Sequence, residues 1–161
     1  SDVTGHALMD EYRRVAGIHF NPLATVYHYW HMAKGNFREY LHGGEVRLKK
    51  YFYVLRPVLA CQWVLSGHGQ PPMAFAKLLD GLVPNGALRL EIEELLRLKM
   101  AAEEMAMGPA RPEINEYLSR SLQLIEESVR DFPRGRLNPE VPDQVDTLLR
   151  TIVRDSGWHS A

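Results

Sequence analysis

Apolar residues recur every three to four positions along most of this 161-residue sequence. That spacing matches the turn of an α-helix, whose apolar side then faces a core. Runs that alternate apolar and polar residues between hairpin turns, which are typical of β-strands, are scarce in the sequence. The chain is therefore predicted to be all-α, a multi-helix bundle of five to seven helices with short connections.

Turn residues divide this pattern into segments. Asn21 and Pro22 form a start signal, because Asn caps a helix and Pro suits its first position. Pro57 lies inside a later helix and should kink it, since proline lacks a backbone donor. The predicted helices span residues 8–16, 21–41, 45–65, 73–79, 88–105, 113–130 and 141–154, with MGPARP (107–112) as a loop.

We expect a helical domain at residues 1–131, with its core at about 20–105, and then a Pro/Gly-rich connection and a C-terminal helix at 132–161. The opening SDVTGHALMD has no initiator Met, so we expect a piece of a longer protein. The formal net charge is −1, so an anionic ligand would need a local basic patch.

The only cysteine, Cys61, excludes a disulfide framework and a Cys-based zinc site. It fits a reducing cytoplasm, where we expect the protein to act, and we expect the thiol to be buried filler. No apolar run approaches the ~20 residues that span a bilayer, so no membrane partner is expected.

Two neighbouring helices carry basic and aromatic residues beside their core faces. Successive residues turn by about 100°, so positions i, i+4, i+7 and i+11 line up along a helix. The core faces are then Val26, Trp30, Ala33, Phe37 and Leu41, and Leu48, Phe52, Leu55, Leu59 and Trp63. The flanking stripes are Tyr27, His31, Lys34 and Arg38, and Lys49, Tyr53, Arg56 and Ala60. Because the short HGGE connection makes the helices antiparallel neighbours, both stripes are predicted to line one groove.

The chemistry of such a groove suits a nucleotide. Lysine and arginine neutralise phosphate oxygens, arginine with a bidentate fork, and Tyr or His can stack on a base. One alternative is that both stripes are solvated flanks, and periodicity alone favours this interpretation because charge on a helix surface is usually solvated. Another is a helical module that docks a protein partner or dimerises.

Three further patterns carry less information. His28 and His31 have the i, i+3 spacing of some helical metal ligands, but no third ligand is evident, so no metal site is predicted. Arg14 and His19 have the R-x4-H spacing of HEPN-type RNases, although Gly17 interrupts the segment. The glutamates of EIEELL (91–96) point to different sides of a helix and are predicted to form a solvated acidic face.

Four segments, taken together, resemble a known family. YHYWHMAKGNFREYL, VRLKKYFYVLRPVLACQWV, PPMAFAKLL and LLRLKMAAEE are similar, in order and spacing, to the C-terminal half of the YcgL/RlaP family of predicted nucleotidyltransferases. That family belongs to the DNA polymerase β-like superfamily, and some members are linked to RNA repair. The resemblance covers roughly residues 20–104, and KKYFYVLRPVLA is its most specific block.

The resemblance implies a substrate-binding helical domain. Family members carry an N-terminal catalytic domain with a Gly-Ser motif and spaced aspartates that hold two metal ions. This sequence has neither motif, so Mg²⁺ is expected only with a catalytic domain outside it, and catalytic residues are expected there. The sequence is then either the helical domain of such an enzyme or a natural relic that lost the catalytic half.

The expected partners are that catalytic domain, an NTP and an RNA end. By resemblance, the residues that contact triphosphate or an RNA end would be Lys34, Asn36, Lys49, Lys50, Tyr53 and Arg56. Lys50 and Asn36 lie off the two stripes. Lys99 and Glu103 also match positions typical of the family, without an evident mechanism.

Overall fold

The computed structural model describes residues 20–101 and 106–131. Within these ranges the helices are α2 (Pro22–Tyr40), α3 (Lys50–Leu65), α4 (Phe75–Leu82), α5 (Ala87–Ala101) and α6 (Pro112–Arg130). Two short strands, β1 (Glu45–Arg47) and β2 (Met107–Pro109), pair antiparallel. The predicted all-α helical bundle is confirmed. The segments predicted as helices at 8–16 and 141–154 lie outside the described residues, as do Arg14 and His19.

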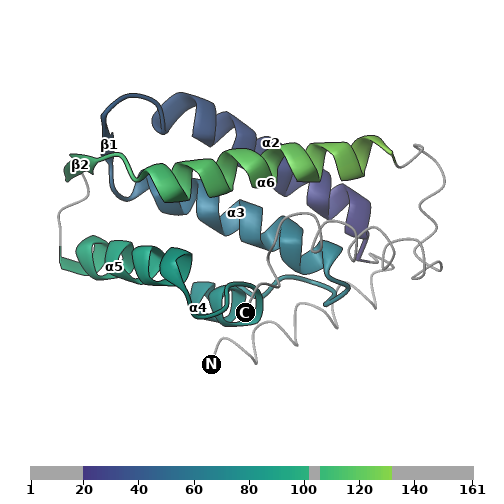
Figure 1. Ribbon diagram of the computed structural model, residues 1–161. Coiled ribbons are helices and arrows are strands. Elements are labelled where there is room, and N and C mark those ends of the chain that lie inside the picture. The colour runs from purple at the N-terminus through teal and green to yellow at the C-terminus, as the bar shows by residue number, and fades with distance from the viewer. Residues whose placement is uncertain (1–19, 102–105, 132–161) are drawn as a thin grey trace.

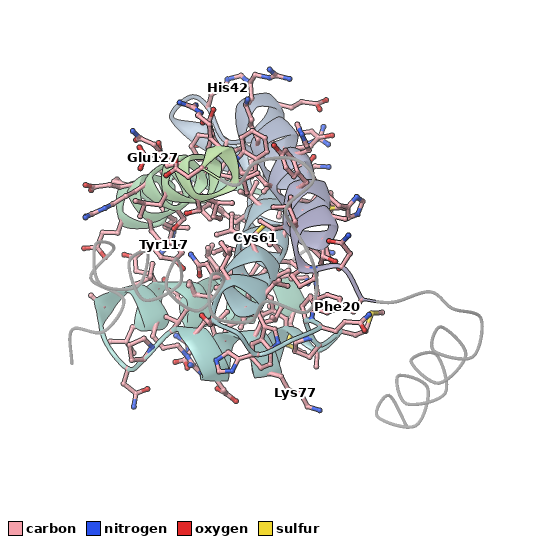
Figure 2. The ribbon with its side chains drawn as sticks, turned by 90° about the vertical axis from the view of Figure 1, so that its right-hand side faces the viewer. Phe20, His42, Cys61, Lys77, Tyr117 and Glu127 are labelled. Atoms are coloured by element: carbon pink, nitrogen blue, oxygen red, sulfur yellow. The ribbon has the colours of Figure 1, made fainter. Side chains whose placement is uncertain are left out.

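The helices form three layers, with α3 in the middle (Figure 1). Helices α2 and α6 cover one side of α3, and α4 and α5 lie on the other side (Figure 1). This central position explains why 12 of the 16 residues of α3 are buried. Cys61 lies at the centre of the bundle (Figure 2), where its thiol donates to the Val26 carbonyl at 3.4 Å and burial raises its pKa. The thiol is therefore buried filler, as predicted.

The hydrophobic core also includes residues of α6, which follows the predicted core at about 20–105. Ile114, Leu118 and Ile125 of α6 are fully buried. The Trp30 indole N–H donates to the Leu122 carbonyl at 3.2 Å and so joins α2 to α6. The helix start at Asn21 is confirmed, because its side chain accepts a hydrogen bond from the Ala24 N–H at 3.1 Å.

We predicted one helix from residue 45 and a loop at MGPARP, but each segment contains a short strand, and helix α3 begins only at Lys50. Residues Glu45–Arg47 form β1, with Val46 paired to Gly108 of β2 and buried between exposed neighbours. The Leu48 N–H donates to the Ala106 carbonyl at 3.0 Å, which extends the pairing. Alternation over so few residues is shorter than a typical strand, so the adjoining helical pattern hid it.

One residue of α3 was assigned to the wrong side. Ala60 was predicted on the polar stripe, but it is buried because α3 is covered from two sides. Trp63, predicted on the core face, is partly buried and packs against the core, with its ring 4.9 Å from the His68 ring. Helix α4 also begins later than the predicted 73–79, at Phe75. Within the part of the chain that the structure describes, no helix is long and apolar enough to cross a membrane.

Gly81 in α4 lies directly against the indole ring of Trp63. A Cβ atom added there would come within 2.6 Å of Trp63 Cζ3, a contact that forces the rigid ring to move. We therefore expect Gly81→Ala to lower the free energy of unfolding by about 1–3 kcal/mol in urea titrations. Gly35→Ala is the matched control: nothing lies within 4 Å of its added Cβ, so helix α2 should gain about 0.5–1 kcal/mol. Equal stability of Gly81→Ala and the unmodified chain would contradict the tight contact.

Three polar side chains join α3 to α6 inside the bundle. The Tyr117 hydroxyl donates to Gln62 Oε1 at 2.8 Å, and the Gln62 amide donates to Ser121 Oγ at 3.2 Å. Burial raises the pKa of Tyr117 to about 12, so the folded chain holds this proton more tightly than the unfolded chain does.

The resulting stabilisation should be complete below the usual tyrosine pKa of about 10 and be lost as the pH rises towards 12. Between about pH 10 and 12 we expect this group to lower the free energy of unfolding by up to about 1.4 kcal/mol per pH unit, measured by urea titration. Tyr117→Phe should flatten the alkaline slope by that amount. An unchanged slope would show that this hydroxyl ionises equally easily in both states.

Candidate functional site

Helix α3 exposes little besides charged and aromatic side chains. Only four of its residues are not buried: Lys50, Tyr53, Arg56 and Trp63. Lys49 immediately precedes the helix and is half-buried. Since residues four apart lie on the same side of a helix, Lys49 and Tyr53 share one surface with Arg56.

Two tyrosines surround the ammonium group of Lys50. Its Nζ atom lies 4.0 Å from the ring centre of Tyr40, at the end of α2, and 4.2 Å from that of Tyr53. The two ring centres are 6.4 Å apart and the planes meet at 80°. The sequence placed Lys50 off the predicted stripe and did not single out Tyr40, which follows Asn36 by one helical turn on the same side.

The Asn36 side chain replaces a backbone hydrogen bond that Pro57 removes from α3. In a helix, the N–H of residue 57 would donate to the carbonyl of Tyr53, but proline has no N–H and its ring crowds that carbonyl. The Asn36 side-chain amide donates to the Tyr53 carbonyl instead, at 3.0 Å. This bond supplies the missing donor and fastens α2 to α3 beside Lys50.

The basic surface continues from α3 onto α4 and α5. The Arg56 guanidinium donates to the Met73 carbonyl and lies 5.7 Å from the ring centre of Phe75. Phe75 packs edge-on against Phe52 at 5.4 Å, and Lys99 Nζ of α5 lies 4.8 Å from the Phe52 ring centre. We call the surface made by Lys49, Lys50, Tyr53, Arg56 and Lys99, with the rings of Tyr40 and Phe75, the α3 basic face.

The other predicted stripe collects around Trp30 instead. Lys34 Nζ lies 4.9 Å from the Trp30 ring centre, and the His31 ring lies 4.6 Å from it. Tyr27 stacks on His31 at 5.8 Å. Arg38 follows on the same side and is exposed. Tyr27, His31 and Lys34 with Trp30 form what we call the Trp30 flank, next to the bond between Trp30 and α6.

The prediction that both stripes line one groove was wrong. Tyr53 contacts α2 through Asn36 and Tyr40. At 100° per residue these two positions lie roughly half a turn around α2 from His31 and Lys34. The structure therefore brings Asn36 and Lys50 to Tyr53, and it places the Trp30 flank on the opposite side of α2.

Carboxylates neutralise several arginines elsewhere in the fold. Arg89 pairs with Asp80 at 2.6 Å and with Glu93 at 2.9 Å, and the hydrogen bond to Asp80 raises its pKa. Arg111 pairs with Glu94 at 3.2 Å. The glutamates of EIEELL therefore form ion pairs, where the sequence predicted a solvated acidic face.

The ligand chemistry of the α3 basic face is that of an anion site. It presents ammonium, guanidinium and phenol groups, whereas Mg²⁺ requires carboxylate or phosphate oxygens, so the face by itself does not fit this ion. Across residues 20–101 and 106–131, no three His, Cys, Asp or Glu side chains are grouped to hold a metal ion. His28 lies with its ring 5.3 Å from Tyr29.

Residues 2–151 match the RlaP family, described as an RNA repair pathway DNA polymerase beta family. The chain belongs to this family. It is also 37% identical over 144 residues to the uncharacterized protein YcgL of Bacillus subtilis (strain 168). No solved structure matches the chain. The resemblance inferred from the four sequence segments is confirmed.

The chain spans about half the length of this curated relative: the match covers 89% of the chain and 54% of YcgL. The family's name describes a whole protein, so it does not by itself assign a task to the helices. The helices themselves indicate which class of ligand suits them, an anion, because several cations lie together on the α3 basic face.

The bond between Asn36 and the Tyr53 carbonyl can be tested with a double-mutant cycle. Asn36→Ala should lower the free energy of unfolding by about 0.5–1.5 kcal/mol, because the carbonyl loses its side-chain donor. In a Pro57→Ala background, residue 57 supplies its own N–H, so the same change should cost less, with a coupling energy of about 0.5 kcal/mol or more in urea titrations. Additive effects of the two substitutions would contradict the assigned role.

Proposed function

We propose that the α3 basic face binds the phosphates of a nucleotide or of an RNA end, as the substrate-binding part of an RlaP-family nucleotidyltransferase. The observation that supports it most is the kind of partner that the cations have. Lys50, Arg56 and Lys99 lie over aromatic rings, and among the described residues none of them forms an ion pair. Arg89 and Arg111, by contrast, pair with carboxylates.

An aromatic ring steadies a cation without cancelling its charge. The attraction is worth about 0.5–1 kcal/mol at an exposed site, whereas a charge-assisted hydrogen bond is worth about 1.5–3 kcal/mol. A phosphate oxygen can therefore draw these groups from their rings. Lysine offers a mobile point charge, and arginine offers a planar fork that matches two phosphate oxygens.

In the whole protein, this face would hold the substrate while the reaction takes place elsewhere. The proposed reaction transfers NMP from an NTP to an acceptor, with carboxylates and Mg²⁺ supplied by a catalytic domain outside this chain. The cations on α3 and α5 would orient the phosphate chain and stabilise the charge that develops on it. We propose the cytoplasm as the site of this activity, as the lone cysteine suggested.

A second candidate is a helical module that docks a protein partner and binds no nucleotide. Exposed apolar side chains on α5 favour it, since Leu90 is 65% and Met100 is 88% exposed. Exposed apolar surface is common on soluble chains, so this observation is less specific than the grouping of the cations.

Calorimetric titration of the 161-residue chain with ATP and with GTP, each with Mg²⁺, tests the proposal. Lys49→Ala combined with Arg56→Ala should weaken binding about a hundredfold or more, because each of the two lost charge-assisted contacts is worth about 1.5–3 kcal/mol. Added salt should weaken binding to the unmodified chain more than binding to this variant.

Arg97→Ala provides the matched control. Arg97 is an exposed cation of the same helix as Lys99, roughly half a turn away from it, so its removal should leave the affinity unchanged. Unchanged affinity in the double variant, or equal losses in the double variant and in Arg97→Ala, would refute the proposed site. If the unmodified chain binds neither nucleotide, this result would favour the second candidate, the helical module that docks a protein partner.

A further inference from the structure

The α3 basic face has two halves of different character. At one end, the rings of Tyr40 and Tyr53 enclose Lys50. At the other end, Arg56 and Lys99 lie over Phe75 and Phe52, which pack against each other. Tyr53 is 42% exposed, whereas Phe52 is buried. Tyr53 in the first half is therefore the most exposed of these four rings, whereas Tyr40 and Phe75 are half-buried.

We infer that Tyr40 and Tyr53 form a nucleobase-binding subsite, in which a base stacks on Tyr53 and the phosphates extend towards Arg56 and Lys99. This inference rests on the proposed function, and it assigns the two halves of the face to two parts of one nucleoside triphosphate. Lys50 belongs to the half with the two tyrosines.

The arrangement of the two rings supports a flat ligand. Their planes meet at 80°, and both ring centres lie about equally far from the Lys50 ammonium, at 4.0 Å and 4.2 Å. Tyr40 and Tyr53 thus form two walls of a corner that already receives a positively charged group. A base that stacks on one wall would turn an edge, where its exocyclic groups lie, towards the other.

Lys50 can exchange one partner for another when a ligand arrives. A base that stacks on Tyr53 takes the position of the ammonium over that ring. The flexible stem of lysine lets the ammonium move to a phosphate oxygen, which binds it more strongly than a ring does. The cation therefore fills the corner before binding and contacts the phosphates afterwards.

The spacing along α3 fits this order of contacts. Tyr53 and Arg56 are three residues apart on the same side, so their Cα atoms are separated by about 4.5 Å along the helix axis. The bond from Asn36 to the Tyr53 carbonyl at 3.0 Å fixes the backbone at the base-stacking end. A nucleotide lying along the helix can then reach the ring of Tyr53 and the guanidinium of Arg56 together.

The test compares ATP with inorganic tripolyphosphate, which carries the phosphates and lacks the base. We expect Tyr53→Ala to weaken ATP binding about tenfold and leave tripolyphosphate binding unchanged, because stacking is lost and the cations remain. Tyr53→Phe should bind both ligands like the unmodified chain. Arg56→Ala should weaken both.

Proton NMR gives a second readout that a purely structural tyrosine would not affect. The base protons of ATP should shift upfield on binding to the unmodified chain and to Tyr53→Phe, because an aromatic ring shields protons stacked on it. The shift should disappear with Tyr53→Ala. Thermal unfolding of each variant shows whether it is folded, and Tyr40→Phe provides a further variant that keeps both rings.

The outcomes separate this inference from the proposed function. If the unmodified chain binds neither ATP nor tripolyphosphate, both are overturned. If it binds both ligands through Arg56 and Tyr53→Ala changes neither affinity nor the proton shift, only the base subsite is overturned. Equal losses of both ligands in a folded Tyr53→Ala variant would likewise overturn the base subsite, since they would show that Tyr53 positions the cations.

Discussion

The hydrogen bond from Asn36 to the Tyr53 carbonyl is the constraint around which the exposed side of α3 is organised. Pro57 removes the helical donor of that carbonyl, and α2 replaces it with a side-chain amide at 3.0 Å. The bond joins α3 to the side of α2 that also carries Tyr40, whose ring lies beside Lys50, whereas Lys34 lies on the other side of α2. The missing N–H of Pro57 thus gives Asn36 a partner next to the residues of the α3 basic face.

Burial of α3 accounts for the composition of that surface. A helix covered by layers on two sides has few positions left for polar residues. Only four residues of α3 are not buried, and three of them are Lys50, Tyr53 and Arg56. None of these three contacts a carboxylate among the described residues. Carboxylates are instead used where α4 meets α5 and where α5 meets α6, through Arg89 and Arg111. The described carboxylates thus pair with arginines at helix junctions and not with the cations that α3 contributes to the α3 basic face.

Sequence periodicity predicted the helices well and the site only in part. Long segments such as α2 and α6 have a proline in the first turn and regular apolar spacing, and α2 also has the Asn21 cap, so their limits were close to those observed. Strand β1 was missed because its alternation covers only Glu45–Arg47 and its partner lies sixty residues away in the chain.

The prediction of a shared groove was wrong for a related reason. Periodicity assigns residues to sides of one helix, but the rotation of α2 relative to α3 depends on tertiary contacts such as that of Trp30 with α6. The family resemblance included Asn36 and Lys50, which periodicity had left aside, and both do contact or adjoin Tyr53. Phe75 could not be recognised, since its place beside Arg56 depends on the path of the chain from α3 to α4.

The position of Lys34 limits what a single ligand can do. The resemblance groups Lys34 with the residues of the α3 basic face, but the structure places it on the Trp30 flank, across α2. A helix with its side chains is about 10–12 Å across, so a nucleotide lying along α3 would not also reach Lys34. A ligand that used both surfaces would have to pass around α2, as a polynucleotide strand could and a free nucleotide could not. The proposed triphosphate site therefore consists of the α3 basic face without Lys34, although the resemblance groups Lys34 with it.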